Sequence, residues 1–480
     1  MDDRPPGARF PRPTLSRRDA FRAAAAGGAG LAVGSVLLGS EPGAGASGGS
    51  LLGVFQVPAA TGNATIDTAS LLGAMDAAAS AGGGIVFVPP GTYAVASGLV
   101  FTADNVWLVG AGWGSVLEPV SKADFDVIST PVPEVPGTPG YVRNFIGVSN
   151  LAINCGKMAG TQAGSGNALH TYGLRYSVID RLYIVGSPNW AVLLDGDATN
   201  FGYDNIVSRC LFDDDAANVF CTYCEANDFT DNRFCWCGSA TAAGQTSSRS
   251  TMAQHLGLDS GYNYVAGNVF GRGGSYTTPA VTTSNNGPCR IIGNRFDQVR
   301  FQAVVLNAGN HCFADNQLGS PGSTGSGVPG IQIESGQNRI TGNVFDDTAG
   351  PIVYTYAIAE AGGPFAGNVI AENTLLRGRL GVIGLNPAST DQIASNPGYN
   401  PVGALGPPPF PASGTPVTNC YGVAVSVAVT AGAKPVSLEV GGAPFLTVPA
   451  GSTACVRLPA GQTLAATYAS SSPSWIWMGD

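Results

Sequence analysis

Lysine is almost absent from this sequence, and charged residues of any kind are scarce. Among 480 residues only three are lysine (Lys122, Lys157 and Lys434), and Asp, Glu, Lys and Arg together make up 11% of the chain. The formal net charge is −9, so the chain lacks the basic surface of a general nucleic-acid-binding protein. No segment beyond the N-terminal region has the run of about 18 apolar residues expected of a membrane span. We therefore expect neither nucleic acid nor a membrane as a partner.

Glycine and proline are abundant, but their arrangement is not that of a fibrous protein. The chain has 68 Gly and 33 Pro without a Gly-X-Y period, which excludes a collagen-like chain. Hydrophobic residues make up 44% of the sequence, which is too many for a disordered chain. The composition therefore indicates a folded protein that is rich in turns.

Residues 1–46 have the composition of an export signal and are set apart from the fold. Six arginines lie within the first 22 residues, including the Arg17-Arg18 pair, and an Ala/Gly-rich stretch follows from Ala23 to Leu38. Small residues at 44–46 fit a cleavage site. The segment resembles a twin-arginine signal peptide. Without it the chain has 17 basic and 28 acidic residues, a charge of −11, and we expect a secreted, extracellular protein.

The ten cysteines are compatible with disulfides in an exported protein. Cys420 and Cys455 are alone in the C-terminal region, so we expect them to pair. Cys221 and Cys224 are three residues apart and Cys235 and Cys237 two apart, but they do not form two regular pairs at zinc-finger spacing. Buried or bridged cysteines are therefore favoured over a metal site.

A short phrase with a central Asn recurs through the middle of the chain. Its Asn residues are Asn232, Asn268, Asn294, Asn316, Asn343 and Asn368, spaced by 22 to 36 residues, and an aromatic or aliphatic residue follows two places later. An apolar strand that ends in Gly precedes several of these phrases, as at Gly261, Gly309 and Gly336. Each repeat therefore predicts strand, tight turn, short strand and Asn turn, stacked as a solenoid. We expect an all-β, right-handed parallel β-helix in which Asn side chains hydrogen-bond from coil to coil.

The segment that opens the repeats supports this architecture. Residues 67–80 form an Ala-rich stretch that predicts a helix over the open end of the solenoid, and Gly82-Gly-Gly-Ile-Val-Phe-Val-Pro-Pro-Gly-Thr-Tyr93 and Val106-Trp-Leu-Val-Gly-Ala-Gly112 follow it. These two segments resemble the opening coil of the pectate-lyase-like superfamily of right-handed β-helices. That superfamily includes polysaccharide lyases, polygalacturonase-type hydrolases, inulin fructotransferases and phage tailspikes. The resemblance spans residues 60–390 and implies the fold, while the opening segment carries no catalytic residue.

The sequence therefore divides into four regions. Residues 1–46 are the signal peptide, and residues 50–395 are the β-helix with its N-terminal helical cap. Residues 396–414 form a Pro-rich linker, and residues 415–480 alternate apolar and polar residues with Gly turns, as in a small β-sandwich. Trp475 and Trp477 share one face of its last strand, where core packing is favoured over a sugar-stacking platform.

Strand alternation predicts which side chains face outward in the glycine-ended strands. Residues three and five before the Gly are mostly apolar and are expected inside. The outward row two places before the Gly reads Thr171, Tyr223, Asp259, Asn307 and Glu334. We expect His255 to share a face with Asp259, and Gln332 to lie beside Glu334. Asp259 and Glu334, with Asn307 between them, are expected two coils or roughly 9–10 Å apart, nearer to the inverting than to the retaining glycosidase arrangement.

A second acidic group lies upstream at Asp213-Asp214-Asp215, with Glu225 at the end of the following strand. Mutual repulsion among three acids would raise at least one pKa, as a general acid requires. Arg249 and Arg272 flank the Asp259 strand and could bind an acidic or hydroxylated polymer. The candidate catalytic residues are thus Asp214, Asp215, Glu225, His255, Asp259 and Glu334, and the candidate substrate-binding residues are Tyr223, Arg249, Arg272, Asn307 and Gln332.

Simpler interpretations stand beside these. A polar row is expected on any exposed sheet face, and Asp213 to Asp215 could be a solvated turn or a calcium site. His170 occupies a position expected to face inward and is interpreted as a core histidine. No cofactor is otherwise indicated. The favoured function is a secreted enzyme that cleaves or rearranges the glycosidic bonds of a polysaccharide by paired carboxylates. The alternatives are a calcium-dependent polysaccharide lyase and a non-catalytic, tailspike-like glycan-binding fibre that forms a homotrimer.

Overall fold

The computed structural model describes most of the chain after residue 52. It describes residues 53–479 except 157, 159–165, 236, 238–253, 272–279, 284–286, 320, 323–326, 347–351, 387, 398, 400–402, 420, 422–423, 460 and 470–472. The expected signal peptide, residues 1–46, lies outside the described residues. Within the described part, no helix has both the length and the apolar character needed to cross a membrane.

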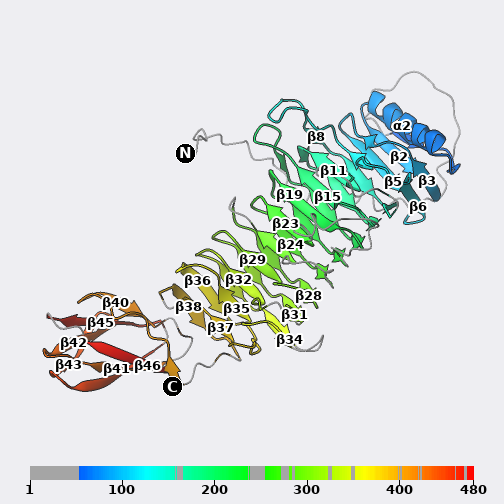
Figure 1. Cartoon of the computed structure of the whole chain (residues 1–480). Helices are drawn as coiled ribbons and strands as arrows, with labels where there is room; N and C mark the ends of the chain where they lie inside the picture. Colours follow the sequence, from blue (N-terminus) through cyan, green and yellow to red (C-terminus); the bar gives the residue numbers. More distant parts are fainter. Residues whose placement is uncertain are drawn as a thin grey trace. The chain divides into compact units, whose positions relative to one another are not determined.

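Three long parallel sheets and a short fourth one form the body of the protein (Figure 1). Sheet A consists of β1 (Gly53–Gln56), β2 (Gly84–Val88), β5 (Val106–Gly110), β9 (Gly147–Ser149), β13 (Val178–Asp180), β17 (Ile206–Ser208), β21 (Asp228–Thr230), β24 (Tyr264–Ala266), β27 (Arg290–Ile292), β30 (Cys312–Ala314), β33 (Arg339–Thr341), β36 (Ala366–Ala371) and β38 (Thr390–Ala394). Sheet B consists of β3 (Gly91–Val95), β6 (Ser115–Pro119), β10 (Ala152–Asn154), β14 (Tyr183–Val185), β18 (Leu211–Asp213), β22 (Arg233–Phe234), β25 (Val269–Phe270), β28 (Arg295–Asp297), β31 (Gln317–Gly319) and β34 (Val344–Asp346).

Sheets C and D complete each coil. Sheet C consists of β4 (Leu99–Val100), β7 (Ile128–Ser129), β11 (Leu169–Tyr172), β15 (Trp190–Asp195), β19 (Ala217–Thr222), β23 (Leu256–Asp259), β26 (Val281–Thr283), β29 (Val304–Leu306), β32 (Ile331–Ile333), β35 (Ile358–Glu360) and β37 (Ile383–Gly384). Sheet D consists of β8 (Arg143–Asn144), β12 (Leu174–Arg175), β16 (Gly202–Tyr203) and β20 (Cys224–Glu225).

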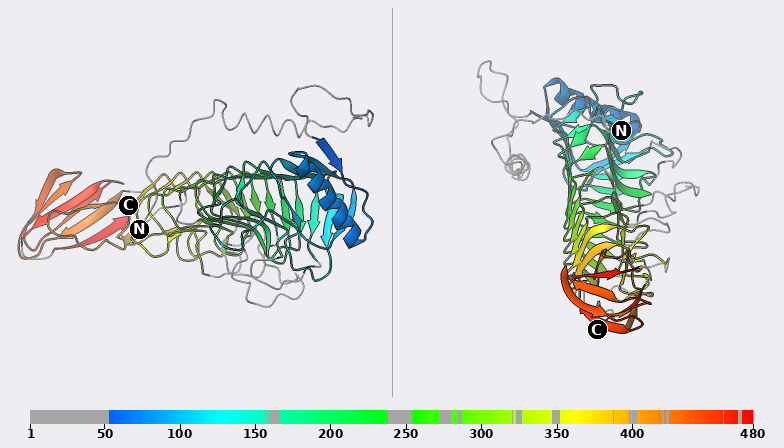
Figure 2. Two further views of the ribbon diagram at one scale, coloured as in Figure 1. Left: turned by 90° about the horizontal axis from the view of Figure 1, so that it is seen from above. Right: turned by 90° about the vertical axis from the view of Figure 1, so that its left-hand side faces the viewer.

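The chain visits the sheets in a fixed order, A then B then C, and passes through D where D is present. Each strand inside a sheet therefore pairs in parallel with its counterparts one coil earlier and one coil later, as with β13 between β9 and β17. Figure 2 shows the strands of successive coils side by side. Parallel crossovers of this kind wind to the right. The predicted right-handed parallel β-helix is confirmed.

One helix, α2 (Ala64–Ser80), covers the first coil, as expected from the Ala-rich stretch. Asn63 caps its N-terminus by accepting hydrogen bonds from the amides of Thr65 and Ile66. Its buried residues Leu71 and Met75 belong to the same hydrophobic core as the first strands. The helix thus removes from water the apolar end that an open solenoid would expose.

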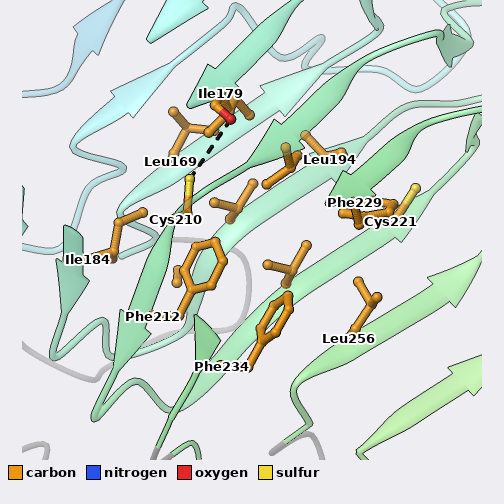
Figure 3. Packing of buried hydrophobic residues seen from close by; sticks show 14 of the residues in the cluster. Leu169, Ile179, Ile184, Leu194, Cys210, Phe212, Cys221, Phe229, Phe234 and Leu256 are labelled. Carbon is orange, nitrogen blue, oxygen red and sulfur yellow. Dashed lines mark hydrogen bonds between the residues drawn. The ribbon is translucent and has the colours of Figure 1, made fainter. Parts of the chain in front are cut away.

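Inward-facing side chains stack along the axis in rows. The inward row of sheet B is aromatic over several coils: Phe212, Phe234, Phe270 and Phe296 stack with ring centroids 4.8 to 5.1 Å apart. Figure 3 shows how Phe212 and Phe234 lie beside aliphatic residues from the other sheets, such as Leu194 and Leu256. The spacing equals the distance between neighbouring strands, so each coil adds one layer to a continuous core.

Two ladders of buried Asn side chains follow the corners on either side of sheet A. In the ladder between sheets A and B, each Asn side-chain oxygen accepts a hydrogen bond of 2.9–3.0 Å from the backbone amide of the residue at the same corner one coil earlier. That donor is Cys210 for the first Asn and the preceding Asn for every other member. The members are Asn232, Asn268, Asn294, Asn316, Asn343, Asn373 and Asn396. This confirms the predicted Asn stacking. Asn368, however, belongs to the second ladder, between Asn338 and the buried Asp391. The first ladder passes through Asn373 instead.

The C-terminal module has two antiparallel sheets. One consists of β39 (Gly403–Leu405), β46 (Ser474–Gly479), β41 (Val425–Thr430) and β44 (Thr453–Leu458), and the other of β40 (Pro416–Thr418), β45 (Thr463–Tyr468), β42 (Val436–Val440) and β43 (Ala443–Val448). Trp475 and Trp477 are buried between them, in the core role favoured by the sequence. Strand β39 and the carbonyl of Pro408, which accepts from Trp475 Nε1, come from the expected linker and are part of this module.

None of the cysteines that the structure describes forms a disulfide. Cys455 is an exposed free thiol, so the expected bridge to Cys420, which lies outside the described residues, is not formed. Most of the others are buried in the β-helix, where Cys221 and Cys224 contact the Asn ladder. Cysteine here acts as a small core residue.

Candidate functional site

The outward face of sheet C carries a row of polar residues where its strands end. The register places Tyr172 beside Asp195, and Thr222 beside Asp259. Because Leu194 pairs with Cys221, Asp195 and Thr222 are also neighbours. Beyond β26 the row continues with Asn307 and Glu334, which follow the paired residues Leu306 and Ile333. We name Tyr172, Asp195, Thr222, Asp259, Asn307 and Glu334 the acidic row.

Three of its members, Asp259, Asn307 and Glu334, were expected from the sequence, whereas two expected members were one residue out of register. Thr171 faces inward and is buried, because it pairs with the core residue Leu194. Tyr223 follows β19 in a turn with φ of 47°, and its ring is exposed beyond the strand. Thr222 occupies the position expected for Tyr223. The error arose because Gly173 follows β11 directly, whereas Ser260 stands between the end of β23 and Gly261, and because Glu225 stands in place of the Gly after β19.

Asp259 and Glu334 are too far apart to act as a pair. Strands β26, β29 and β32 follow β23, so the two residues are separated by three strand spacings, about 14 Å. The expected distance of two coils is wrong, because the sequence repeat of β26 was not recognised. Glu334 instead accepts a hydrogen bond from Gln332, which in turn accepts one from Gln302 at 2.6 Å. Gln332 thus lies beside Glu334, as expected.

A buried histidine and two carboxylates lie at the N-terminal end of the acidic row. His170 Nδ1 is 2.7 Å from Asp126 Oδ2, and its Nε2 is 3.5 Å from Asp195 Oδ2. Asp126 is held in turn by the backbone amide and side chain of Asn167. The side chain of Asp195 is 28% exposed, whereas that of His170 is 7% exposed. Of these two side chains, Asp195 is therefore the one that a substrate could contact, and His170 lies buried against it.

The charge of this group follows from its contacts. Burial alone would lower the pKa of His170, but the hydrogen bonds and charges of Asp126 and Asp195 raise it to about 9. His170 is therefore an imidazolium at neutral pH, next to a carboxylate at the protein surface. On the same face of the sheet, Trp190 stacks on Phe220 and forms an apolar cluster with Leu193.

Tyr172 and Asp197 lie next to this group. Burial and a hydrogen bond to Asp197 raise the pKa of the Tyr172 hydroxyl. Burial opposes ionisation of Asp197, but hydrogen bonds from Tyr172 and from the amides of Asn200, Gly137 and Thr199 hold its pKa well below the usual range. The Tyr172 hydroxyl therefore donates a hydrogen bond to the Asp197 carboxylate and is unsuited to act as a base.

The structure does not bring the second predicted acidic group together on one surface. Asp215 is fully buried where sheet B passes into sheet C, and its Oδ1 accepts from the amide of Ser187 at 2.7 Å. Burial raises its pKa well above the ordinary value, so it is a neutral acid within the fold. Asp214 precedes it in a turn, whereas Glu225 lies on sheet D beyond β19. The six residues of β19 span roughly 20 Å, so Asp214 and Glu225 do not cooperate.

His255 points into the core and not to the surface. Its ring lies about 6 Å from the rings of Phe234 and Phe270. Nδ1 lies 2.8 Å from the side-chain nitrogen of Asn218, and Nε2 lies 2.9 Å from the carbonyl oxygen of Gly271. The expectation that His255 shares the outward face with Asp259 is wrong, because β23 begins at Leu256 and His255 lies buried in the corner before it. Cys237 Sγ is 3.8 Å from Nε2, but Nε2 must carry the proton given to Gly271. His255 therefore cannot activate this thiol.

Arg249, Arg272 and His311 are the residues from the sequence analysis that remain. Arg249 and Arg272 lie outside the described residues. His311 takes an Asn position in the second ladder, where its Nδ1 accepts from the amide of Cys289. Across the described ranges, no group of three or more His, Cys, Asp or Glu side chains is arranged to hold a metal ion.

Sequence reasoning missed Asp126, His170 and Asp195. His170 was interpreted as a core residue because the register of its strand was set one residue off, which turned an outward position inward. Asp195 was overlooked because β15 ends in Asp-Gly without a following Asn phrase at the expected distance. The clearest available signal was the uninterrupted apolar run of residues 190–194, which an acid follows.

Comparisons with known proteins support the fold. No family model matches the chain, and no curated protein matches its sequence. Among solved structures, DFA-IIIase from Arthrobacter chlorophenolicus A6 superposes with a TM-score of 0.50 at 13% identity, covering 71% of this chain and 94% of that one. The mannuronan C-5 epimerase A-module from Azotobacter vinelandii (TM-score 0.34, 17% identity, 68% and 96% covered) and a tailspike protein of E. coli bacteriophage HK620 with a bound pentasaccharide (0.43, 15%, 68% and 61%) are more distant. The fold is that of the right-handed parallel β-helices, as the resemblance implied.

Proposed function

We propose that this right-handed parallel β-helix, of the pectate-lyase-like superfamily, is a secreted enzyme that cleaves or rearranges glycosidic bonds of a polysaccharide lying along the acidic row. Asp195 and Asp259 are the carboxylate pair. The observation that carries the proposal is their position: both face outward in one row, two strands apart with Thr222 between them. Two strand spacings are about 9.6 Å, close to the separation that leaves room for a water molecule in inverting glycosidases.

The surroundings of the two acids favour different roles. The imidazolium of His170 lies 3.5 Å from the carboxylate of Asp195 and attracts it, an arrangement that suits a general base that accepts a proton from the attacking water or sugar hydroxyl. Asp259 is exposed, and it accepts a hydrogen bond from the Thr222 hydroxyl at 3.3 Å. It is then the general acid, which donates a proton to the leaving glycosidic oxygen. His170 and Asp126 are positioning residues for Asp195.

Two features favour glycosidic transfer or hydrolysis over a lyase reaction. A lyase that acts on uronates must neutralise the substrate carboxylate, yet no Lys or Arg occurs among the six members of the acidic row. Tyr172 pairs with Asp195 across the strands and has a hydroxyl of raised pKa, and such a group is a poor base for abstracting a carbon-bound proton. A neutral polysaccharide fits this surface better than an acidic one.

The test compares amide variants of individual acids on a panel of neutral and acidic polysaccharides. We expect D195N and D259N each to lower the rate of reducing-end release or glycosyl transfer by about a hundredfold or more, the loss typical of a general acid or base. D215N is the matched control, because Asn replaces an acid that is buried outside the acidic row, and it should retain activity.

Three outcomes would contradict the proposal. Unchanged turnover in D195N and D259N would remove the site. Products that absorb in the ultraviolet as unsaturated uronates, lost with chelator, would indicate a calcium-dependent lyase. Glycan binding without any cleavage by the wild-type protein would indicate a fibre, and a trimer in solution would then support the tailspike-like alternative.

A further inference from the structure

Two loops meet over the N-terminal end of the acidic row. One is residues 131–140, which we name the strap; it follows β7 after Thr130 and leads toward β8. The other is the loop of residues 196–200, between β15 and β16. In the coil between them, only Gly173 separates β11 from β12. Both loops therefore emerge at the junction of sheets C and D, on either side of a single tight turn.

Two side chains of the 196–200 loop fasten the strap. Asp197 Oδ2 accepts from the amide of Gly137 at 2.6 Å, and Gly137 has a φ of 85°, which a residue with a side chain rarely adopts. Asn200 Nδ2 donates to the carbonyl of Thr138 at 2.9 Å, and its Oδ1 accepts from the amide of Tyr141. Asn200 is itself buried. The two loops are thus joined into one bridge.

The bridge lies directly on the turn beneath it. A Cβ atom added to Gly173 would stand 3.2 Å from the carbonyl oxygens of both Asn200 and Tyr141, one from each side. Tyr172, the first member of the acidic row, is 5% exposed, and its hydroxyl is bound to Asp197. The next member, Asp195, has 28% of its side chain exposed. The open part of the row therefore begins at Asp195.

We propose that the bridge blocks the path of a polysaccharide along the acidic row next to Asp195, so that the enzyme acts near a chain end and releases a mono- or disaccharide. The inference rests on the proposed function, since it takes the bond to be cleaved to lie beside Thr222, between Asp195 and Asp259. From Thr222 to the covered Tyr172 there are two strand spacings, on the order of 10 Å. That length holds one or two sugar units, and a longer chain would collide with the strap.

The experiment follows product length and the need for a free end. The polymer is whichever panel polysaccharide the wild-type protein cleaves or, if none, binds; it is supplied untreated and with both ends chemically blocked. In the main variant, one glycine replaces residues 132–142, which copies the turn at Gly173 because Arg143 and Leu174 are aligned. N200A loosens the bridge without shortening the chain, in case the main variant does not fold. V135S, on an exposed strap side chain, is the matched control.

We expect the wild-type protein and V135S to release only mono- or disaccharide from the first time points and to act at least tenfold more slowly on end-blocked polymer. The strap replacement should release longer oligosaccharides and cleave the end-blocked polymer, with N200A between the two. Long products from the wild-type protein, or unchanged product lengths in a folded strap replacement, would overturn the inference. So would equally tight wild-type binding of blocked and free polymer. Full activity of D195N would instead overturn the proposed function, whatever the product length.

Discussion

The three histidines show how neighbours decide the charge of a buried group. Burial works in the same direction for all three and lowers the pKa of each ring. Among the described residues, the ring nitrogens of His255 and His311 contact neutral groups, and their pKa values fall to about 4. His170 lies between Asp126 and Asp195, and its pKa rises to about 9. The chain thus contains two histidines that resist protonation and one that retains its proton.

The first residue-scale prediction concerns H170Q. Because the folded pKa of His170, about 9, lies above the ordinary 6.5, its contribution to stability is fully present below about pH 6.5 and is lost as pH rises through 9. A shift of this size corresponds to on the order of 3 kcal/mol. We expect H170Q to be less stable than wild type by that order near pH 6, with a smaller difference near pH 10. Denaturant unfolding at the two pH values measures it. An equal difference at both would contradict the charged state of His170.

The second residue-scale prediction concerns H311N and has the opposite sign. The folded pKa of His311, about 4, lies below 6.5, so the native state loses stability as pH falls from 6.5 toward 4. Asn can take the same position, since its side-chain oxygen can accept from the amide of Cys289 as Nδ1 does. We expect H311N to be tolerated at neutral pH and to unfold less readily than wild type near pH 4. Acid titration of the folded fraction provides the measurement, and a parallel loss in both proteins would count against it.

At the scale of single elements, the Asn ladder depends on several buried hydrogen bonds at each Asn. Asn294 accepts from both nitrogens of Asn268 and donates to the carbonyl of Val265 and to Asn316, and it is 1% exposed. Every one of these groups is beyond the reach of bulk water. Removing one rung therefore leaves donors and acceptors of two neighbouring coils without partners.

We accordingly expect N294A to lower the free energy of unfolding by about 2–4 kcal/mol, the cost of leaving several buried polar groups unsatisfied. V344T, which alters an exposed strand residue of similar size, should cost less than about 1 kcal/mol. Chemical denaturation of both variants tests the pair. If N294A were as stable as V344T, the ladder would be an accompaniment of the fold and not a support for it.

The element scale also shows what the sequence could predict. The Asn phrases and the opening segment predicted the solenoid, because a buried Asn at a corner leaves a mark every coil. The phrase failed at Asn368, where Asn373 lies five residues later and only one of the two fits the ladder between sheets A and B. The site depended on strand register, which the Gly after a strand marked unreliably, since Gly173 follows β11 one residue earlier than Gly261 follows β23. One residue of error there turned His170 from the outward face of sheet C to the inward face and hid its carboxylate partners.

At the scale of the whole molecule, the described residues form two folded regions, each with its own large hydrophobic core. One core runs through the β-helix from Val57 to Leu375, and the other lies between the two sheets of the C-terminal module. All members of the proposed site belong to the first region. The C-terminal module therefore has no part in the proposed chemistry.

A variant that ends after residue 401 tests this division. We expect it to fold, to cleave polysaccharide within about threefold of the full chain and to unfold in a transition that the full chain also shows, since each core buries its own apolar surface. Calorimetry and the cleavage assay measure the two parts of the prediction. A truncated chain that folds but has lost cleavage would show that the module takes part in the reaction.

The corner ladder has a further consequence for how this architecture could be re-engineered. Asn232 and Asn268 are 36 residues apart and Asn294 and Asn316 are 22 apart, yet in both pairs the backbone amide of the first Asn lies 2.9 Å from the side-chain oxygen of the second. The extra residues of the longer coil therefore do not change the geometry of the corner. Segments such as the strap could therefore be exchanged, lengthened or randomised one coil at a time, and a combinatorial library built on this scaffold should vary recognition while inheriting an unchanged frame.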